Sequence, residues 1–177
     1  MDFRLPKDYV KNNPNILEQV ASDINKNFHY FFQGQVGSGK TYLADAIAKY
    51  HEFKIIKARE VYRDYLRLMN SDYSDKNEQL TKIVRILRGK NVIFDDIGAE
   101  KPKTAASANF IEDIIEDRYD WWKKGLAERT IFTTNLTGIE LGELYGDRVV
   151  DRLQEMFIIM KFKKVSFRTK KQKIIEG

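Results

Sequence analysis

The sequence is poor in the residues that build covalent or metal cross-links. It contains no cysteine, three prolines and two histidines among 177 residues. The absence of cysteine excludes disulfide bonds and thiolate zinc sites. The histidines, His29 and His51, do not stand in ligand spacing. We therefore expect no metal centre built from histidine or cysteine.

Long apolar runs are missing as well. No stretch approaches the roughly 20 apolar residues that span a bilayer. The segment Met1–Val10 is charged and lacks the apolar centre of a secretion signal. Hydrophobic residues make up 42% of the chain and charged residues 32%. This balance, with a length that suits one domain, predicts a cytoplasmic globular protein with a real core and no membrane contact.

Positive charge exceeds negative charge and gathers near the end of the sequence. The formal net charge is +5. Lys or Arg occupies seven of the thirteen positions in 161–173, namely Lys161, Lys163, Lys164, Arg168, Lys170, Lys171 and Lys173. Two interpretations stay open for this segment: a solvated tail, or a surface that contacts the phosphates of DNA or RNA.

One short motif states its chemistry directly. The segment Gly34–Thr41 reads GQVGSGKT and fits G-x-x-x-x-G-K-[ST], the phosphate-binding loop. Its glycines let successive backbone N–H groups turn toward phosphates at the positive end of a following helix. In this pattern Lys40 reaches the β- and γ-phosphates, and the Thr41 hydroxyl binds Mg²⁺. The nucleotide-binding residues we expect are Gly34, Gln35, Val36, Gly37, Ser38, Gly39, Lys40, Thr41 and Tyr42.

The flanks of this motif favour the phosphate-binding interpretation over a glycine-rich turn without a ligand. His29–Gln33 reads as a buried strand, and Thr41–Tyr50 reads as an amphipathic helix. Further along the chain, helices and strands alternate. The other helices are expected over 15–24, 59–69, 77–88, 105–124 and 144–154, and the other strands over 53–58, 91–95, 130–134 and 157–162. Alternation of this kind predicts an α/β fold with a five-stranded parallel sheet between helices.

A pair of carboxylates, Asp95 and Asp96, ends the apolar strand 91–95. In a parallel sheet this end lies beside the phosphate loop. We therefore expect Asp95 to hold Mg²⁺, directly or through water, and Asp96 to polarise the attacking water. A solvated acidic turn would be the better interpretation if the phosphate loop were absent.

Asn135 follows the strand 130–134 in the same way. Its amide suits a hydrogen bond to the γ-phosphate or to the attacking water. It suits a turn or helix cap before Thr137 and Gly138 equally well, so spacing alone leaves both roles open.

Two arginines stand four residues apart in the segment GDRVVDRL, at Arg148 and Arg152. Such residues lie on one face of a helix. An arginine that stabilises γ-phosphate charge from a neighbouring subunit would look like this. Surface ion pairs with Asp147 and Asp151 would look the same, and they are favoured on the residues alone.

The order of these motifs resembles that of the DnaC/DnaI-type helicase loaders. The chain reads GQVGSGKT, VIFDDIGAEK, RTIFTTNL, YGDRVVDRL and VSFR in this order. The IstB-type transposition helper ATPases share the pattern, and both groups are AAA+ proteins similar to the DnaA replication initiators. The stretch Asp95–Lys101 is the most specific part, and the resemblance covers Phe28–Arg168.

The resemblance implies an AAA+ P-loop NTPase core with ATP and Mg²⁺ as cofactors. It matches Gly34, Gly37, Gly39, Lys40 and Thr41 to Walker A, Asp95 and Asp96 to Walker B, and Asn135 to sensor 1. Arg152 matches the segment that carries the arginine finger, and Arg148, one turn earlier, is the alternative. Because such a finger acts in trans, the resemblance implies self-association into ATP-bound oligomers, as an open spiral or filament.

The sequence departs from the loader pattern in two respects. Loaders carry an N-terminal domain that grips the replicative helicase, whereas 33 residues precede Gly34 here. No C-terminal lid domain is expected after Arg168. The organisation we expect is a lead-in over 1–27, an AAA+ ATPase domain over 28–168 and a basic tail over 169–177. The adenine pocket would then draw on Phe3–Tyr9 of the lead-in.

The resemblance also implies single-stranded DNA as a ligand. The candidate contacts are Arg59, Arg63, Arg67, Lys101 and Lys103, with Tyr62 and Tyr65 as residues that could stack on bases. A solvated basic helix face explains each of these residues equally well. Trp121 and Trp122 are expected to serve packing at the end of the long helix.

The leading hypothesis from the sequence is a compact ATPase from a phage or mobile element that loads or remodels a replicative helicase on single-stranded DNA. The alternatives are an IstB-type transposition helper that binds duplex DNA, and a non-enzymatic decoy that blocks a host loader or helicase. A small-molecule kinase would need a lid and a substrate pocket, and the sequence offers no segment for either.

Overall fold

The computed structural model describes residues 5, 7–23, 25–69, 91–100 and 105–163. Its centre is one sheet of five parallel strands in the order β2-β3-β4-β1-β5. The strands are β1 (His29–Gln33), β2 (Lys54–Lys57), β3 (Val92–Ile97), β4 (Thr130–Thr134) and β5 (Ile158–Lys161). The α/β class and the five-stranded parallel sheet expected from the sequence are confirmed.

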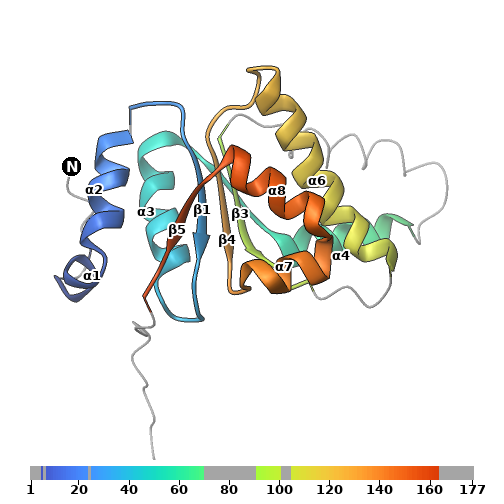
Figure 1. The fold of residues 1–177 in the computed structure, drawn as a ribbon, viewed down its shortest axis with the longest axis horizontal. Coiled ribbons are helices and arrows are strands. Elements are labelled where there is room, and N and C mark those ends of the chain that lie inside the picture. Colours follow the sequence, from blue (N-terminus) through green and yellow to red (C-terminus); the bar gives the residue numbers. More distant parts are fainter. Residues whose placement is uncertain (1–4, 6, 24, 70–90, 101–104, 164–177) are drawn as a thin grey trace, which may run out of the picture.

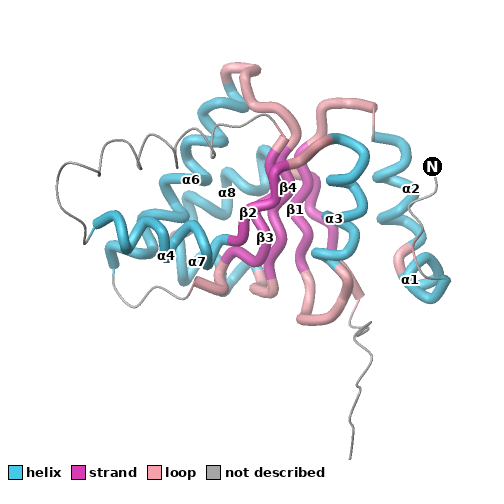
Figure 2. The backbone as a smooth tube through the Cα atoms, turned by 180° about the vertical axis from the view of Figure 1, so that it is seen from behind, coloured by secondary structure: helices cyan, strands magenta, loops and turns pink. Residues whose placement is uncertain are grey.

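Helices cover both faces of this sheet, so the molecule has three layers (Figure 1). The helices α1 (Lys7–Asn12), α2 (Pro14–Asp23) and α3 (Lys40–His51) lie on one side, with α3 next to the strands. The other side carries α4 (Ala58–Met69), α6 (Ala105–Lys123), α7 (Gly138–Tyr145) and α8 (Asp147–Met156). Figure 2 shows the same division from behind.

Strand alternation creates two separate cores. Successive side chains of a strand point to opposite faces. Phe31 therefore packs in the core with Phe94, Phe132 and the helices of the α6–α8 side. Its neighbours Tyr30 and Phe32 join the other core, which α3 and α2 close. All of these aromatic side chains are buried, because every strand of the middle of the sheet is covered on both faces.

The prediction of one helix over 144–154 is wrong, because two helices occupy this region. Thr137 caps α7: its hydroxyl accepts from the Glu140 N–H at 3.3 Å, and the Glu140 carboxylate accepts from the Thr137 N–H at 2.7 Å. Gly146 then takes a φ of +88°, which ends α7 and starts α8 in a new direction. The capping box explains why α7 begins at Gly138, six residues before the start at 144 that hydrophobic spacing alone suggested.

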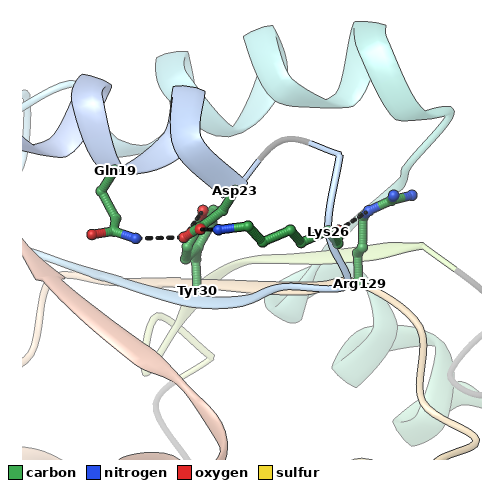
Figure 3. A network of polar contacts seen from close by, with 5 residues as sticks. All are labelled: Gln19, Asp23, Lys26, Tyr30 and Arg129. Atoms are coloured by element: carbon green, nitrogen blue, oxygen red, sulfur yellow. Dashed lines mark hydrogen bonds and ion pairs between the residues drawn. The ribbon is translucent and has the colours of Figure 1, made fainter.

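A polar cluster, here called the anchor, fixes α2 to the sheet (Figure 3). It consists of Gln19, Asp23, Lys26 and Tyr30. The buried Asp23 carboxylate accepts from the Gln19 amide at 2.5 Å, the Lys26 ammonium at 3.0 Å and the Tyr30 hydroxyl at 3.0 Å. Burial alone would raise the pKa of Asp23, but these three donors outweigh it and lower the pKa. The anchor therefore holds α2 on β1 through an ionised carboxylate.

The loop beside the anchor ties it to the rest of the sheet. The Arg129 guanidinium, just before β4, donates to the Lys26 carbonyl at 2.9 Å and lies 5.6 Å from the Phe28 ring centre.

The short helix α1 precedes α2, within the segment 1–27 that the sequence predicts as a lead-in. Among the described residues, no helix is long and apolar enough to cross a membrane.

Candidate nucleotide-binding site

A pocket of about 540 Å³ opens where β1, β3 and β4 end. The carboxyl ends of parallel strands meet at one edge of a sheet, and ligands bind there. The lining residues are Tyr9, Val36, Gly37, Gly39, Lys40, Thr41, Tyr42, Asp95, Asp96, Thr133 and Asn135. Most residues expected from the sequence to bind a nucleotide or to act on it are therefore brought together. We call this part of the molecule the nucleotide edge.

The loop from Gly34 to Gly39 leads directly into the N-terminus of helix α3. Gly39 has a φ of +91° and stands immediately before the helix, where its carbonyl accepts from the Leu43 N–H at 3.0 Å. A Cβ at Gly39 would lie 2.2 Å from Cε2 of Tyr9, so only glycine fits. The first residues of α3, Lys40 to Tyr42, line the pocket, and the positive end of a helix favours an anion.

Lys40 is held at the centre of this loop. Its Nζ donates to the Gly34 carbonyl at 2.7 Å, the Gln35 carbonyl at 3.0 Å and the Asn135 Oδ1 at 2.8 Å. Oγ of Ser38, a buried residue of the same loop, lies 3.5 Å from Lys40 Nζ. The ammonium group is thus a fixed point charge at the pocket wall, as phosphate binding requires.

The carboxylates Asp95 and Asp96 are positioned by hydroxyl groups and an amide. Oδ1 of the buried Asp95 accepts from the Thr41 hydroxyl at 2.8 Å and from the Thr133 hydroxyl at 2.7 Å. The Asp96 N–H donates to the same Thr133 hydroxyl at 2.8 Å, and Oδ1 of Asp96 accepts from Nδ2 of Asn135 at 2.6 Å. Asp96 has a φ of +64°, a backbone state that aspartate tolerates better than most residues.

The oxygens of Thr41 and Asp95 fit a magnesium ion. Mg²⁺ prefers hydroxyl, carboxylate and phosphate oxygens at about 2.1 Å in octahedral geometry, so neighbouring ligands lie roughly 2.9 Å apart. The Thr41 Oγ1 and Asp95 Oδ1 atoms are 2.8 Å apart. The pair could therefore serve as two adjacent ligands without rearrangement of the backbone. Among the described residues, no cluster of three or more His, Cys, Asp or Glu side chains offers a different metal site.

Sequence reasoning missed Thr133. This residue is 1% exposed and links the Asp95 carboxylate to the Asp96 backbone, because its hydroxyl donates to Asp95 Oδ1 and accepts from the Asp96 N–H. The available signal was its position in a strand two residues before Asn135, which places both side chains on the same face.

Tyr9 supplies the part of the wall that comes from the lead-in. Its hydroxyl donates to the Gly39 carbonyl at 3.1 Å, and its ring centre is 5.8 Å from that of Tyr42. Burial raises the pKa of Tyr9, so the phenol keeps its proton. The described part of Phe3–Tyr9 thus reaches the pocket through one aromatic ring, while Phe3 lies outside the described residues.

Arg148 and Arg152 lie away from the pocket on α8. Both contact the Glu116 carboxylate of α6, with 3.3 Å from Arg148 Nη2 to Glu116 Oε2. The side chain of Arg148 is 72% exposed, whereas that of Arg152 is 15% exposed and lies over the Tyr119 ring. The described ion-pair partner is thus Glu116 on another helix, where the sequence suggested Asp147 and Asp151.

The basic residues of α4 are exposed to solvent, whereas its tyrosines are buried or half-buried. Arg59, Arg63 and Arg67 are exposed, and Arg59 donates to the Ala99 carbonyl at 3.3 Å. The idea that Tyr62 and Tyr65 stack on bases is wrong for this structure. Tyr62 is buried, and Tyr65 stacks on the Phe110 ring with centres 4.4 Å apart.

Other expectations on nucleic-acid contacts fall partly outside the structure. The candidates Lys101 and Lys103, the basic tail and the expected helix 77–88 lie outside the described residues. Trp121 and Trp122 are half-buried and pack against the core under α6, as expected.

Comparisons with known proteins agree with this geometry. The profile of the family described as IstB-like ATP binding protein matches residues 7–174. No curated protein matches the sequence. The fold is similar to the crystal structure of the DnaC helicase loader, with 22% identity, a TM-score of 0.67 and coverage of 89% of this chain and 100% of that one.

The fold is also similar to that of DnaA replication initiators. AMPPCP-bound DnaA from Aquifex aeolicus has 17% identity and a TM-score of 0.66, over 86% of this chain and 47% of that one. Domain III of the Thermotoga maritima DnaA has 20% identity and a TM-score of 0.65, over 90% and 68%. At these identities the likeness concerns the fold, which is that of an AAA+ P-loop protein.

Proposed function

The chain belongs to the family of IstB-like ATP-binding proteins, and from this premise we propose that it binds ATP with Mg²⁺ and hydrolyses it. The observation that supports hydrolysis is the contact network around Asn135. Its amide joins Lys40, through Oδ1 at 2.8 Å, to Asp96, through Nδ2 at 2.6 Å. One side chain thus sets the distance between the phosphate-binding cation and the candidate base.

The roles within the site follow from this arrangement. Lys40 and the N–H groups at the start of α3 bind the phosphates, and Thr41 with Asp95 holds the magnesium ion, which when bound neutralises phosphate charge. Asp96 orients the attacking water and accepts its proton. Asn135 keeps the Asp96 carboxylate aimed at the γ-phosphate. Tyr9 and Tyr42 form the part of the pocket wall that would contact the adenine ring of ATP.

Completion of the site requires a second copy of the chain. No described arginine lines the pocket, although an arginine is worth several orders of magnitude in related phosphoryl transfers. The side chain of Arg148 is 72% exposed, which leaves it accessible to a neighbouring copy, whereas Arg152 is 15% exposed and shares the contact to Glu116. We place the arginine finger at Arg148, with Arg152 as the alternative from the motif resemblance.

We further propose that the ATPase acts on a replicative helicase at single-stranded DNA. The motif order and the likeness of the fold to a DnaC helicase loader support this role. A transposition helper that binds duplex DNA is the second candidate, and the match to the IstB-like family profile favours it. The two differ in partner and in DNA preference, which makes them separable.

The hydrolysis proposal is tested by the substitution Asp96→Asn. It should retain the affinity for ATP and lose most turnover, because an amide cannot accept the proton of the attacking water. Asp113→Asn, an exposed position of α6, is the matched control and should leave turnover intact. Unchanged turnover in Asp96→Asn would exclude the role assigned to that carboxylate.

The partner is tested by mixing the purified protein with its host's hexameric replicative helicase, with and without ATP and Mg²⁺. The mass of the product is measured by light scattering after size exclusion. A defined complex supports helicase loading. Self-assembly on duplex DNA without a helicase complex would favour the transposition role instead.

A further inference from the structure

The turn after β3 packs tightly against the end of β4. The Ala99 N–H donates to the Asp96 carbonyl at 3.1 Å, which closes the turn. The Thr134 hydroxyl donates to the Ile97 carbonyl at 2.8 Å. A Cβ at Gly98 would lie 2.4 Å from Cδ1 of Leu136. The turn that carries Asp96 therefore cannot shift without disturbing its neighbours.

Glu100 closes this turn with a buried carboxylate that the nucleotide site does not use. It is 8% exposed and does not line the pocket. One oxygen, Oε2, accepts from the Gly98 N–H at 2.9 Å, and the other, Oε1, accepts from the Tyr145 hydroxyl. Burial raises the pKa of Glu100, the backbone N–H groups oppose this, and the charge of Asp96 raises the pKa further.

Tyr145 connects the carboxylate to the helix that presents the arginines. It is the last residue of α7, and its ring is buried in the core on the α6–α8 side. Gly146 follows, and α8 begins at Asp147, one residue before the exposed Arg148. A single hydroxyl–carboxylate contact thus joins the turn of Asp96 to the start of α8.

We propose that Glu100 and Tyr145 are a positioning pair that couples the nucleotide site of one subunit to the arginine it presents to the next. The pair does not touch the reacting atoms. It sets the direction of α8 relative to the turn after β3. A change in the position of Asp96 therefore alters the position of Arg148. This inference rests on the proposed function, because it assumes that nucleotide binds at Asp96 and that Arg148 acts in trans.

The first test measures coupling without hydrolysis. Amide hydrogen exchange of residues 146–150 is followed by mass spectrometry with and without the slowly hydrolysed analogue ATPγS and Mg²⁺. We expect the analogue to slow exchange in the unmodified protein, and Tyr145→Phe to lose that response while it keeps its affinity for the analogue. An intact response in Tyr145→Phe would overturn the inference.

The second test measures turnover. Tyr145→Phe keeps the buried ring and removes the contact to Glu100, and one hydrogen bond to a carboxylate corresponds to about a tenfold change in rate when it acts on the transition state. We expect about a tenfold lower kcat with an unchanged Kd for ATP. The double variant Glu100→Ala with Tyr145→Phe should be no slower than Glu100→Ala alone, since both remove the same contact.

Tyr30→Phe is the matched control. It also removes a tyrosine hydroxyl from a buried carboxylate, that of Asp23, but it lies in the anchor. It should change neither kcat nor the exchange response. If Tyr30→Phe and Tyr145→Phe lowered kcat and the exchange response equally, the contact between Glu100 and Tyr145 would be structural only, and the inference would be overturned. An unmodified protein that binds no nucleotide would instead overturn the proposed function itself.

Discussion

Two buried carboxylates, each receiving a tyrosine hydroxyl, behave differently in the anchor and at the turn of the nucleotide edge. Asp23 of the anchor has two further side-chain donors, Gln19 and Lys26, and its pKa is lowered. Glu100 has backbone N–H groups and Tyr145, stands near the negative Asp96, and has a raised pKa. Similar contacts thus lower the pKa of the carboxylate in the anchor, whereas burial and a neighbouring negative charge raise the pKa of the carboxylate at the turn.

The difference shows how the molecule separates stability from function. The anchor holds helices on the sheet at the end remote from the pocket, where an ionised carboxylate with full partners stabilises the fold. At the end of β3, Asp95 and Asp96 line the pocket, and the charge of Asp96 contributes to the raised pKa of Glu100. Substitutions in the anchor should therefore change the free energy of unfolding, and those at the nucleotide edge should change turnover.

The largest effect is expected from Asp95→Asn at the nucleotide edge. The amide cannot serve as an anionic ligand, so Mg²⁺-dependent turnover should fall by about a thousandfold, the scale reported for loss of a central electrostatic group. The midpoint of urea unfolding should change little. Asp23→Asn should lower the midpoint of urea unfolding and leave turnover nearly unchanged. Loss of turnover in Asp23→Asn would contradict the comparison.

Acid should lower the free energy of unfolding through His29, the first residue of β1. Burial, and then the charge of Arg118, lower the pKa of His29 from 6.5 to about 4. The unfolded chain therefore takes up a proton that the folded chain does not, so stability is present above pH 6.5 and is lost as the pH falls toward 4. The loss amounts to about 3 kcal/mol.

Urea unfolding between pH 8 and pH 4 measures this loss. The variant His29→Gln cannot be protonated in this range, so its unfolding free energy should vary less with pH. An equally steep decline in His29→Gln would assign the acid sensitivity to other groups. The Asp23 carboxylate does not contribute in this window, because its lowered pKa places its loss of stability below its ordinary value of 3.8.

Thr133→Val tests the link between the Asp95 carboxylate and the Asp96 backbone. It keeps the shape of the side chain but removes one donor to Asp95 and the acceptor for the Asp96 N–H. Turnover should fall by roughly tenfold, since both hydrogen bonds of the Thr133 hydroxyl are lost. Thr130→Val, in the same strand but hydrogen-bonded to Arg118 and the Glu128 carbonyl, is the control, and its turnover should stay unchanged.

The smallest effect is expected from Tyr30→Phe in the anchor. Asp23 keeps two of its three side-chain donors, so the free energy of unfolding should fall by about 1 kcal/mol. Chemical denaturation measures this directly. A loss of several kcal/mol would show that the Tyr30 hydroxyl, rather than Gln19 and Lys26, carries the anchor.

Several parts of the site could be predicted from the sequence because their residues are adjacent along the chain. The loop Gly34–Thr41 and the pair Asp95–Asp96 follow apolar strands directly, so their place at one sheet edge follows from parallel pairing. The break at Gly146 escaped prediction because the hydrophobic spacing of 144–154 fits one helix. The capping box at Thr137 and Glu140 was visible in the sequence and explains the earlier start.

Local apolar periodicity and one short motif encode the fold class, the strands and the phosphate loop, so these could be predicted from the sequence. Which residues meet across the chain depends on how the strands and helices pack. The order β2-β3-β4-β1-β5 places Thr133 between Asp95 and Asp96. It also places Glu100 against Tyr145, and the packing of α8 on α6 exposes Arg148 while it shelters Arg152. These relations depend on long-range contacts, which local patterns do not specify.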